Sequence, residues 1–206
     1  MVTTKKTTAE ILQRARDTLH TAELGLLALQ STDPRTRVAG VRNVVVFGRA
    51  VTNVLQNLRS TESGFEDWYK PEVEAMEAEP LMKYLYKLRT EILKEGSIPL
   101  AHSTRLSGNL SDLMRQFETP PGARAFFIGD PIGGSGWEVE TDTGQVEKFY
   151  VVIPRDLPGF KLEISAYFPE APSEISRTPI EVVCKTYLER LTTVVHGAQT
   201  RFGSAA

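Results

Sequence analysis

Arg89 and Lys94 are the side chains whose types and spacing say most about possible chemistry in this sequence. They lie five positions apart at the end of a stretch with amphipathic helical periodicity, and Gly96 follows as the residue expected to stop that helix. Two cations at one helix end could together hold a phosphate group. The alternative is structural, because the helix dipole favours exposed cations at a helix C-terminus.

The nine residues 88–96 (LRTEILKEG) resemble the signature helix end of the HEPN superfamily. In that signature an arginine, often followed by asparagine, precedes a histidine and commonly a glycine. Arg89 and Gly96 match the pattern, whereas Thr90 replaces the asparagine and Lys94 replaces the histidine, which leaves a degenerate Arg-x4-His motif. HEPN proteins are helical bundles, and many are metal-independent RNases of defence and toxin systems. The resemblance covers roughly residues 9–96.

The lysine at position 94 bears directly on the activity that this resemblance implies. Histidine titrates near neutral pH and suits general acid–base catalysis, whereas lysine, with an ordinary pKa of about 10.4, stays charged and is a poor base. The resemblance therefore implies a degenerate, binding or regulatory component of a bacterial stress or defence system, associated with RNA or with a partner protein. It also implies a homodimer formed through the motif helices.

Two other function classes remain open from the residues alone. One is an active metal-independent ribonuclease, a toxin or defence effector, in which burial lowers the pKa of Lys94. The other is a protein-interaction module without a nucleic-acid role, which would use a sheet and the glycine-rich loop 129–136 as a binding edge. That loop leads into a predicted strand and has no P-loop lysine, so a wide turn between strands is its structural interpretation.

Further candidate residues lie on two other predicted helices. Arg42, Asn43 and Arg49 interrupt a very apolar stretch, and they are candidate binding residues, members of an internal polar network or a polar stripe. Arg190 and His196 have a full arginine-to-histidine spacing and are the alternative catalytic pair. Their alternative interpretation is a structural role on the last helix.

Composition excludes several classes of protein. The chain has 206 residues and a formal net charge of -2, so no global field attracts it to nucleic acid or membrane. Its only cysteine, Cys184, excludes a disulfide framework and fits a reducing cytoplasm. The three histidines are widely separated, so neither a metal nor a cofactor is expected. No secretory signal and no apolar run of about 20 residues is present, so we expect no membrane association.

Helical periodicity dominates the first half of the chain. Thr7 and Glu10 have capping-box spacing, and Asp33-Pro34 predicts a second helix start. That second helix should continue toward Arg59, and Gly48 within it should let another backbone come close. A third helix is expected from near Pro71, and Pro80 should interrupt or restart it.

The remainder of the chain predicts strands and one more helix. Strands are expected at 123–128, 137–141, 146–153 and 160–168, with a hairpin turn at 142–144 and a short helical piece near 110–117. A last helix should open at Thr178-Pro179 with a capping box to Glu181. The expected class is α+β, mainly α, with four to five helices and a small antiparallel sheet. The expected segments are a bundle (1–122), a β region (123–170) and a C-terminal helix packing back on the bundle (171–206).

Overall fold

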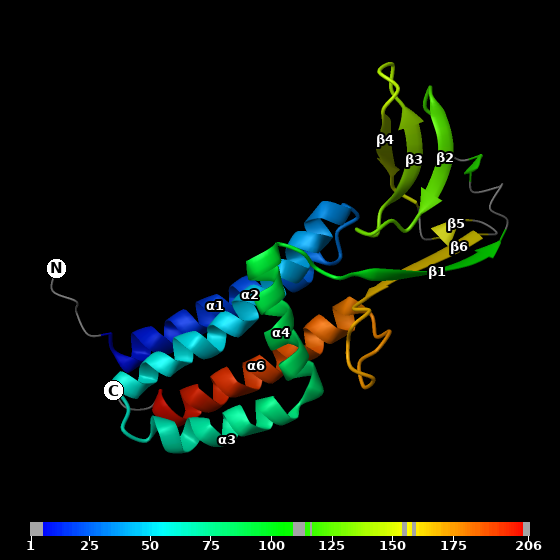
Figure 1. Cartoon of the computed structure of the whole chain (residues 1–206). Helices are drawn as coiled ribbons and strands as arrows, with labels where there is room; N and C mark the ends of the chain where they lie inside the picture. Colours follow the sequence, from blue (N-terminus) through cyan, green and yellow to red (C-terminus); the bar gives the residue numbers. More distant parts are fainter. Residues whose placement is uncertain (1–5, 109–113, 116, 154–155, 158–159, 204–206) are drawn as a thin grey trace.

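In the part of the chain that the structure describes, five helices form an elongated bundle from which two small sheets project (Figure 1). The computed structural model describes residues 6–108, 114–115, 117–153, 156–157 and 160–203. The helices are α1 (Thr8–Ala28), α2 (Pro34–Leu55), α3 (Phe65–Ala78), α4 (Pro80–Glu95) and α6 (Ile180–Phe202), and a 3-10 helix η1 (Gln56–Ser60) extends α2. The long helices lie side by side, and α4 crosses them. The predicted α+β, mainly α, class is confirmed.

Two helix starts have the caps that the sequence predicts. Glu10 donates its amide to Thr7 Oγ1 at 3.2 Å, and the Thr7 amide donates to Glu10 Oε2 at 2.9 Å, which completes the capping box. The Asp33 carboxylate accepts the amides of Arg35 at 3.3 Å and Thr36 at 2.8 Å. These contacts satisfy backbone donors that have no partner within the helix.

The predicted start of the third helix was wrong, whereas the last helix starts where predicted but lacks its predicted capping box. The third helix begins at Phe65 rather than near Pro71, which lies inside α3. Phe65 and Tyr69 are buried and stack at 4.9 Å, so tertiary packing outweighs the backbone hydrogen bond that Pro71 removes. No side chain caps α6, which begins after Pro179. The Glu181 carboxylate is engaged elsewhere, with the Arg37 guanidinium at 2.9 Å.

The core lies along the faces that the helical periodicity predicts, and α2 occupies its centre. Val41, Val45 and Leu55 are fully buried, and α2 contacts α1, α4 and α6. Gly48 was predicted to let another backbone come close, and this prediction was wrong. A Cβ at Gly48 would meet the Tyr187 side chain at 2.4 Å rather than another backbone. The backbones of α1 and α2 come close instead at Gly25 and Gly40.

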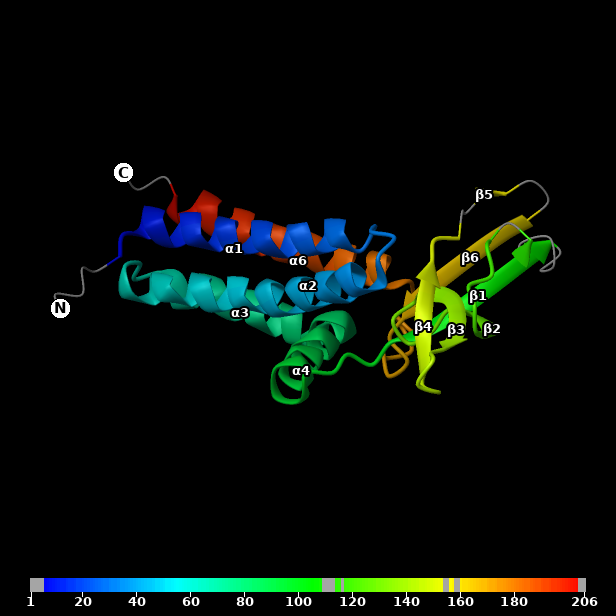
Figure 2. The same cartoon turned by 90° about the horizontal axis from the view of Figure 1, so that it is seen from above.

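The strands form two three-stranded antiparallel sheets rather than one. β1 (Ala101–Gly108), β6 (Phe160–Tyr167) and β5 (Asp156–Leu157) have the order β1-β6-β5. β2 (Ala123–Ile128), β3 (Ser135–Glu140) and β4 (Val146–Val151) have the order β2-β3-β4. The β1–β6 ribbon extends away from the bundle, and the β2-β3-β4 sheet stands beside the α1–α2 turn (Figure 2).

The predicted β3–β4 hairpin is confirmed. Its turn is closed by the Thr141 amide, which donates to the Gln145 carbonyl at 2.8 Å, and Gly144 has φ 78°. The sequence did not predict β1, so β structure begins earlier than residue 123. Most of the helical piece expected near 110–117 lies outside the described residues.

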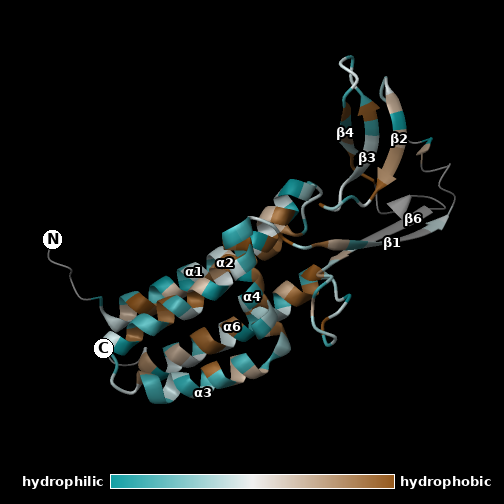
Figure 3. Cartoon of the chain, in the orientation of Figure 1, coloured by the Kyte–Doolittle hydropathy of each residue, from teal (hydrophilic) through white to brown (hydrophobic). Residues whose placement is uncertain are grey.

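Hydrophobic residues are not confined to the bundle. Figure 3 shows hydrophobic segments on β3 and β4, in the sheet that projects from the helices. Trp137 of β3 is buried against Phe126 of β2, with ring centroids 4.9 Å apart. Phe149 and Val146 of β4 are about half exposed, at 55% and 50%. The outer strand of this sheet therefore keeps apolar side chains in contact with solvent.

Candidate functional site

The two cations of the degenerate motif lie on different sides of α4. Arg89 is partly buried, next to the buried positions Leu85 and Ile92, and its Nε is buried without a hydrogen-bond partner in the described part of the chain. Lys94 is exposed. Five helical positions correspond to a rotation of about 140°, so the two side chains do not converge from one helix face. The structure therefore does not assemble Arg89 and Lys94 into one site.

Arg42 is instead the residue that the structure brings to the motif. Its Nη2 donates to the Gly96 carbonyl at 2.5 Å, and Gly96 has φ 68° at the C-terminus of α4. A cation at this position satisfies a free carbonyl and suits the negative end of the helix dipole. Asn43, its neighbour, is exposed and lies close to Gly25 of α1. The hydrogen bond to the Gly96 carbonyl gives Arg42 a role in capping the C-terminus of α4.

The alternative pair on α6 is also not assembled. Arg190 donates from Nε to Glu79 at 2.8 Å and from Nη2 to Glu72 at 3.2 Å. Two carboxylates of α3 and the turn after it therefore neutralise this guanidinium. His196 is exposed, six positions along the helix. A paired arginine of this kind is occupied by the protein itself, which leaves it unsuited to a phosphate.

Arg49 is the predicted residue that lines a cavity. The cavity has a volume of about 600 Å³ and lies among α2, η1, α3, α4 and α6. We call it the Arg49 cavity. Its lining combines basic, acidic, polar and apolar side chains: Arg49, Thr52, Gln56, Arg59, Tyr69, Val73, Met76, Glu77, Met82, Lys83, Tyr86, Tyr187 and Leu191. Cavities of this size commonly hold small molecules.

Contacts of the Arg49 guanidinium hold it at the cavity wall without neutralising it. Its Nη1 donates to the Thr52 hydroxyl, and the guanidinium carbon lies 5.0 Å from the centre of the Tyr86 ring. No carboxylate lies within ion-pair distance of Arg49 or Lys83 among the described residues. Arg59, by contrast, is paired with Glu66. The positive charge of Arg49 is therefore available to an anion.

Tyrosine side chains contribute a second property of the Arg49 cavity. Tyr86 is 56% exposed and presents its ring at the cavity, where a planar group could stack. Burial raises the pKa of Tyr69 and of Tyr187, and the nearby charge of Arg49 only partly offsets this effect. Both phenols therefore stay protonated at neutral pH and can donate hydrogen bonds. No histidine is among the described residues that line the cavity.

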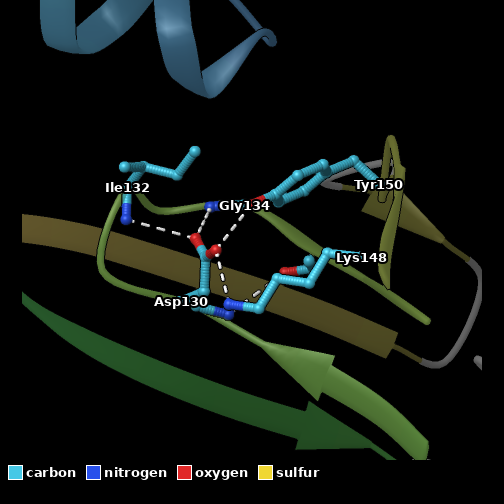
Figure 4. Close-up of polar contacts among 7 residues, drawn as sticks. Asp130, Ile132, Gly134, Lys148 and Tyr150 are labelled. Atoms are coloured by element: carbon cyan, nitrogen blue, oxygen red, sulfur yellow. Dashed lines mark hydrogen bonds and ion pairs between the residues drawn. The ribbon is translucent and has the colours of Figure 1, made fainter. Parts of the chain in front are cut away.

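The glycine-rich loop 129–136 is held by Asp130 (Figure 4). Its carboxylate accepts the amides of Ile132 at 3.2 Å and Gly134 at 2.9 Å, the Tyr150 hydroxyl at 2.7 Å and Lys148 Nζ at 2.9 Å. Burial acts to raise the pKa of Asp130, but these hydrogen bonds together hold it below its usual value. The carboxylate is fully engaged inside the protein. Its contacts agree with the interpretation of this loop as a turn between strands.

Neither a reactive cysteine nor a metal-binding cluster is found among the described residues. Cys184 is completely buried on α6, and burial raises its pKa to about 12, so it remains a thiol. No group of three or more histidine, cysteine, aspartate or glutamate side chains in the described ranges could hold a metal ion.

One described helix, Pro34–Ser60, is long and apolar enough to cross a membrane by length and composition. It comprises α2 and η1, and 44% of the apolar window is buried inside the protein. Its buried residues include Val41, Val44 and Val45, which pack in the centre of the bundle. The buried face of this helix therefore packs against the other helices of the bundle.

Comparison with known proteins gives one family match. Residues 18–115 match a family described as "Bacteriophage lambda protein ea47". The matched segment runs from α1 through α4 and β1, and it contains Arg49, Tyr86 and Arg89 but not α6. No curated protein and no solved structure matches the chain. The family description names a bacteriophage protein and no activity.

Most of the residues that line the Arg49 cavity were not predicted from the sequence. Arg49 was recognised as a polar residue in an apolar helix, whereas Tyr69, Lys83 and Tyr86 were not predicted as site residues. One signal was present, because Tyr86 and Lys83 share the side of α4 that is not required by the buried positions Leu85 and Leu88. Their convergence with Arg49 depends on the crossing of α2 and α4, which helical periodicity does not specify.

Proposed function

We propose that this protein is a HEPN-like binding protein without RNase activity at Arg89 and Lys94, and that the Arg49 cavity holds RNA. The observation that carries the proposal is the state of Arg49. This arginine is partly buried, lines a cavity and has no acidic partner among the described residues, whereas Arg37, Arg59 and Arg190 each have one. An arginine in this environment favours a phosphate.

The aromatic ring beside Arg49 supports RNA over a simple inorganic anion. Single-stranded nucleic acid is commonly bound by a cationic groove for the backbone and by aromatic rings for the bases. Arg49 and Lys83 would contact the phosphate, and the exposed ring of Tyr86 would stack with a base. Tyr69 and Gln56 would supply hydrogen bonds to the ribose or base. One nucleotide within a single strand fits these groups.

Binding without cleavage is the second part of the proposal. Cleavage needs a group that exchanges a proton near neutral pH, and the lining supplies protonated tyrosines and no histidine among the described residues. The separation of Arg89 from Lys94 around α4 also argues against catalysis by the degenerate motif. On the resemblance to HEPN proteins, the proposed setting is the cytoplasm, in a bacterial stress or defence system.

Retention of fluorescent single-stranded RNA by purified Arg49→Glu protein tests the proposal. The substitution replaces the unpaired cation of the cavity by an anion, so we expect at least a tenfold weaker affinity at low salt. Arg14→Glu is the matched control, because Arg14 is an exposed arginine on α1 outside the cavity. It makes the same change in net charge and should weaken binding only slightly.

Three further outcomes are informative. Equal losses in Arg49→Glu and Arg14→Glu would show a diffuse charge effect and contradict binding in the cavity. Tyr86→Ala should also weaken binding, and Tyr86→Phe should restore it if stacking is the contribution. RNA cleavage in EDTA that disappears in Arg89→Ala would contradict the proposal of a binding protein without RNase activity.

A further inference from the structure

Strand β4 is the outer strand of its sheet and has no strand beside it on its far side within the described residues. The order is β2-β3-β4, so β3 is the strand that pairs with β4. Every residue from 146 to 150 is exposed, and Val146, Phe149 and Val152 have exposures of 50%, 55% and 63%. Edge strands with exposed apolar residues can pair with another strand, and proteins usually block such pairing with charges or proline.

The free edge of β4 presents hydrogen-bonding groups in a defined alternation. The Thr141 amide donates to the Gln145 carbonyl at 2.8 Å, and opposite residues in an antiparallel pair alternate between bonded and non-bonded. With the register Glu140↔Val146 and Trp137↔Phe149, Phe149 is bonded to β3, whereas Val146 is not. Backbone groups of Val146, Lys148 and Tyr150 therefore point toward the free edge.

Aromatic side chains form a row across the sheet that ends at this edge. Phe126 pairs with Trp137, and Trp137 pairs with Phe149 in the next strand. The first two rings are 4.9 Å apart, and Trp137 is buried. Phe149 terminates the row with more than half of its surface exposed. A further strand beside β4 would extend the row and cover this ring.

We propose that β4 pairs antiparallel with β4 of a second copy of this chain, around a two-fold axis at Phe149. Phe149 then lies opposite Phe149 of the other copy, at a non-hydrogen-bonded position. Lys148 lies opposite Tyr150, and Val146 lies opposite Val152. The side chains of Val146, Phe149 and Val152 thereby each gain an apolar or aromatic neighbour, and the two sheets become one continuous sheet.

Charges on the strand disfavour two other two-fold registers of the same pairing. A two-fold axis at Lys148 would place two lysines opposite each other, and an axis at Glu147 would place two glutamates opposite each other. Like charges directly opposite are destabilising in a sheet. The axis at Phe149 avoids both arrangements and pairs the apolar positions with one another. A closed two-fold contact of this kind uses the β4 edges of both copies, so no β4 edge remains for further chains.

Disulfide trapping in the full chain tests this geometry. Non-hydrogen-bonded cross-strand residues have Cα atoms about 4.5 Å apart, within the range that a disulfide bridges. Phe149→Cys should therefore form a covalent dimer under mild oxidation. Glu147→Cys is the matched control, because it lies on the same face and would be about 13 Å from its counterpart, from four residues at ~3.3 Å each. Native Cys184 is buried and should not contribute.

The expected result is cross-linking of Phe149→Cys and not of Glu147→Cys. Equal cross-linking of both variants, or of neither, would overturn the proposed register. A second measurement needs no cysteine: light scattering of the wild-type chain should give twice the 22.9 kDa chain mass at high concentration. Phe149→Lys, which opposes two cations at the axis, should give the mass of one chain.

The two proposals can fail separately. A wild-type dimer that survives Phe149→Lys would place the contact elsewhere, for example on the motif helices, and would overturn pairing through β4. A wild-type chain that remains single at high concentration would overturn it as well. Neither result depends on RNA, because Phe149 lies outside the Arg49 cavity.

Discussion

At the scale of single residues, the arginines of this protein are distinguished by their partners. Arg190 is bound to two carboxylates and Arg42 to a helix-end carbonyl, whereas Arg49 has a hydroxyl and a tyrosine ring. A guanidinium that is saturated by carboxylates contributes to stability, and one without an acidic partner remains available for a ligand. The three arginines therefore differ in which groups the folded chain places around them.

Replacement of Arg190 by alanine should destabilise the fold. The change leaves Glu72 and Glu79 without their cation, and these groups are partly buried, with side-chain exposures of 30% and 42%. A loss of about 1–2 kcal/mol in the free energy of unfolding is expected, between the values for exposed and buried pairs. Urea denaturation at pH 7 measures it.

Lys185→Ala is the control for that experiment. Lys185 also forms an ion pair on α6, with Glu189, but both side chains are more than 60% exposed. The loss should therefore stay within about 0.5 kcal/mol. A wild-type stability for Arg190→Ala would contradict the structural role and return Arg190 to the list of catalytic candidates.

The sequence predicted one residue of the Arg49 cavity and could not predict the rest. Arg49 stands out because it interrupts an apolar helix face. Tyr69, Lys83 and Tyr86 come from other helices, and each has an ordinary position on an amphipathic pattern. Which faces meet depends on helix crossing angles and on the packing of particular side chains. The resemblance directed attention to Arg89 and Lys94, whereas only the folded chain shows that these two residues diverge.

At the scale of elements, the close contact between α1 and α2 is built on two glycines. A Cβ at Gly25 of α1 would lie 2.7 Å from the Gly40 carbonyl, and a Cβ at Gly40 of α2 would lie 2.6 Å from the Gly25 carbonyl. These neighbours are backbone atoms, which cannot move aside as a side-chain end can. The two helices can therefore approach closely only because both residues lack a side chain.

Alanine at Gly25 or Gly40 should separate α1 from α2. Alanine gains about 1 kcal/mol of helix propensity over glycine, but the clash in a packed interface costs typically 1–3 kcal/mol or more. We expect a net destabilisation of about 1–2 kcal/mol in thermal or urea unfolding for each variant. Gly64→Ala is the control, since nothing lies within 4 Å of a Cβ there. A stabilised Gly40→Ala would disprove the close crossing.

The helices and strands were predictable to different degrees. Buried stripes along α1, α2, α4 and α6 follow from periodicity, and the hairpin turn at 142–144 follows from its residue types. β1 was missed because its sequence, AHSTRLSG, has few apolar residues and no regular alternation. It is a strand because it pairs with β6 over eight residues, and this long-range pairing has no local signal.

At the scale of the whole molecule, a partly buried polar junction joins the bundle to the sheets. Arg37 of α2 donates from Nε to the Leu29 carbonyl at 3.2 Å and pairs with Glu181 of α6 at 2.9 Å. His102 of β1 lies against Gly133 of the glycine-rich loop, where a Cβ would be 2.8 Å from its Nε2. Residues of α2, α6, β1 and the glycine-rich loop therefore lie within a few ångströms of one another at this junction.

The junction predicts a pH dependence of stability through His102. Burial lowers the pKa of His102 below its usual 6.5, and the charge of Arg37 lowers it further, whereas Asp130 and Glu181 act in the opposite direction. The unfolded chain therefore binds a proton at higher pH than the folded chain does. The contribution of neutral His102 to the free energy of unfolding is complete above about pH 6.5. This contribution is lost as the pH falls below that value.

Urea unfolding at pH 7.5 and pH 5.5 measures this effect. Wild type should be less stable at pH 5.5, and His102→Gln should lose most of the difference because glutamine does not titrate. The control is His20→Gln, since His20 is exposed on α1 and this variant should keep the wild-type difference. Asp33 and Asp130 do not interfere, because their pKa values lie below the usual 3.8 and they stay ionised at both pH values. An unchanged difference in His102→Gln would show that acid acts on the fold at another group.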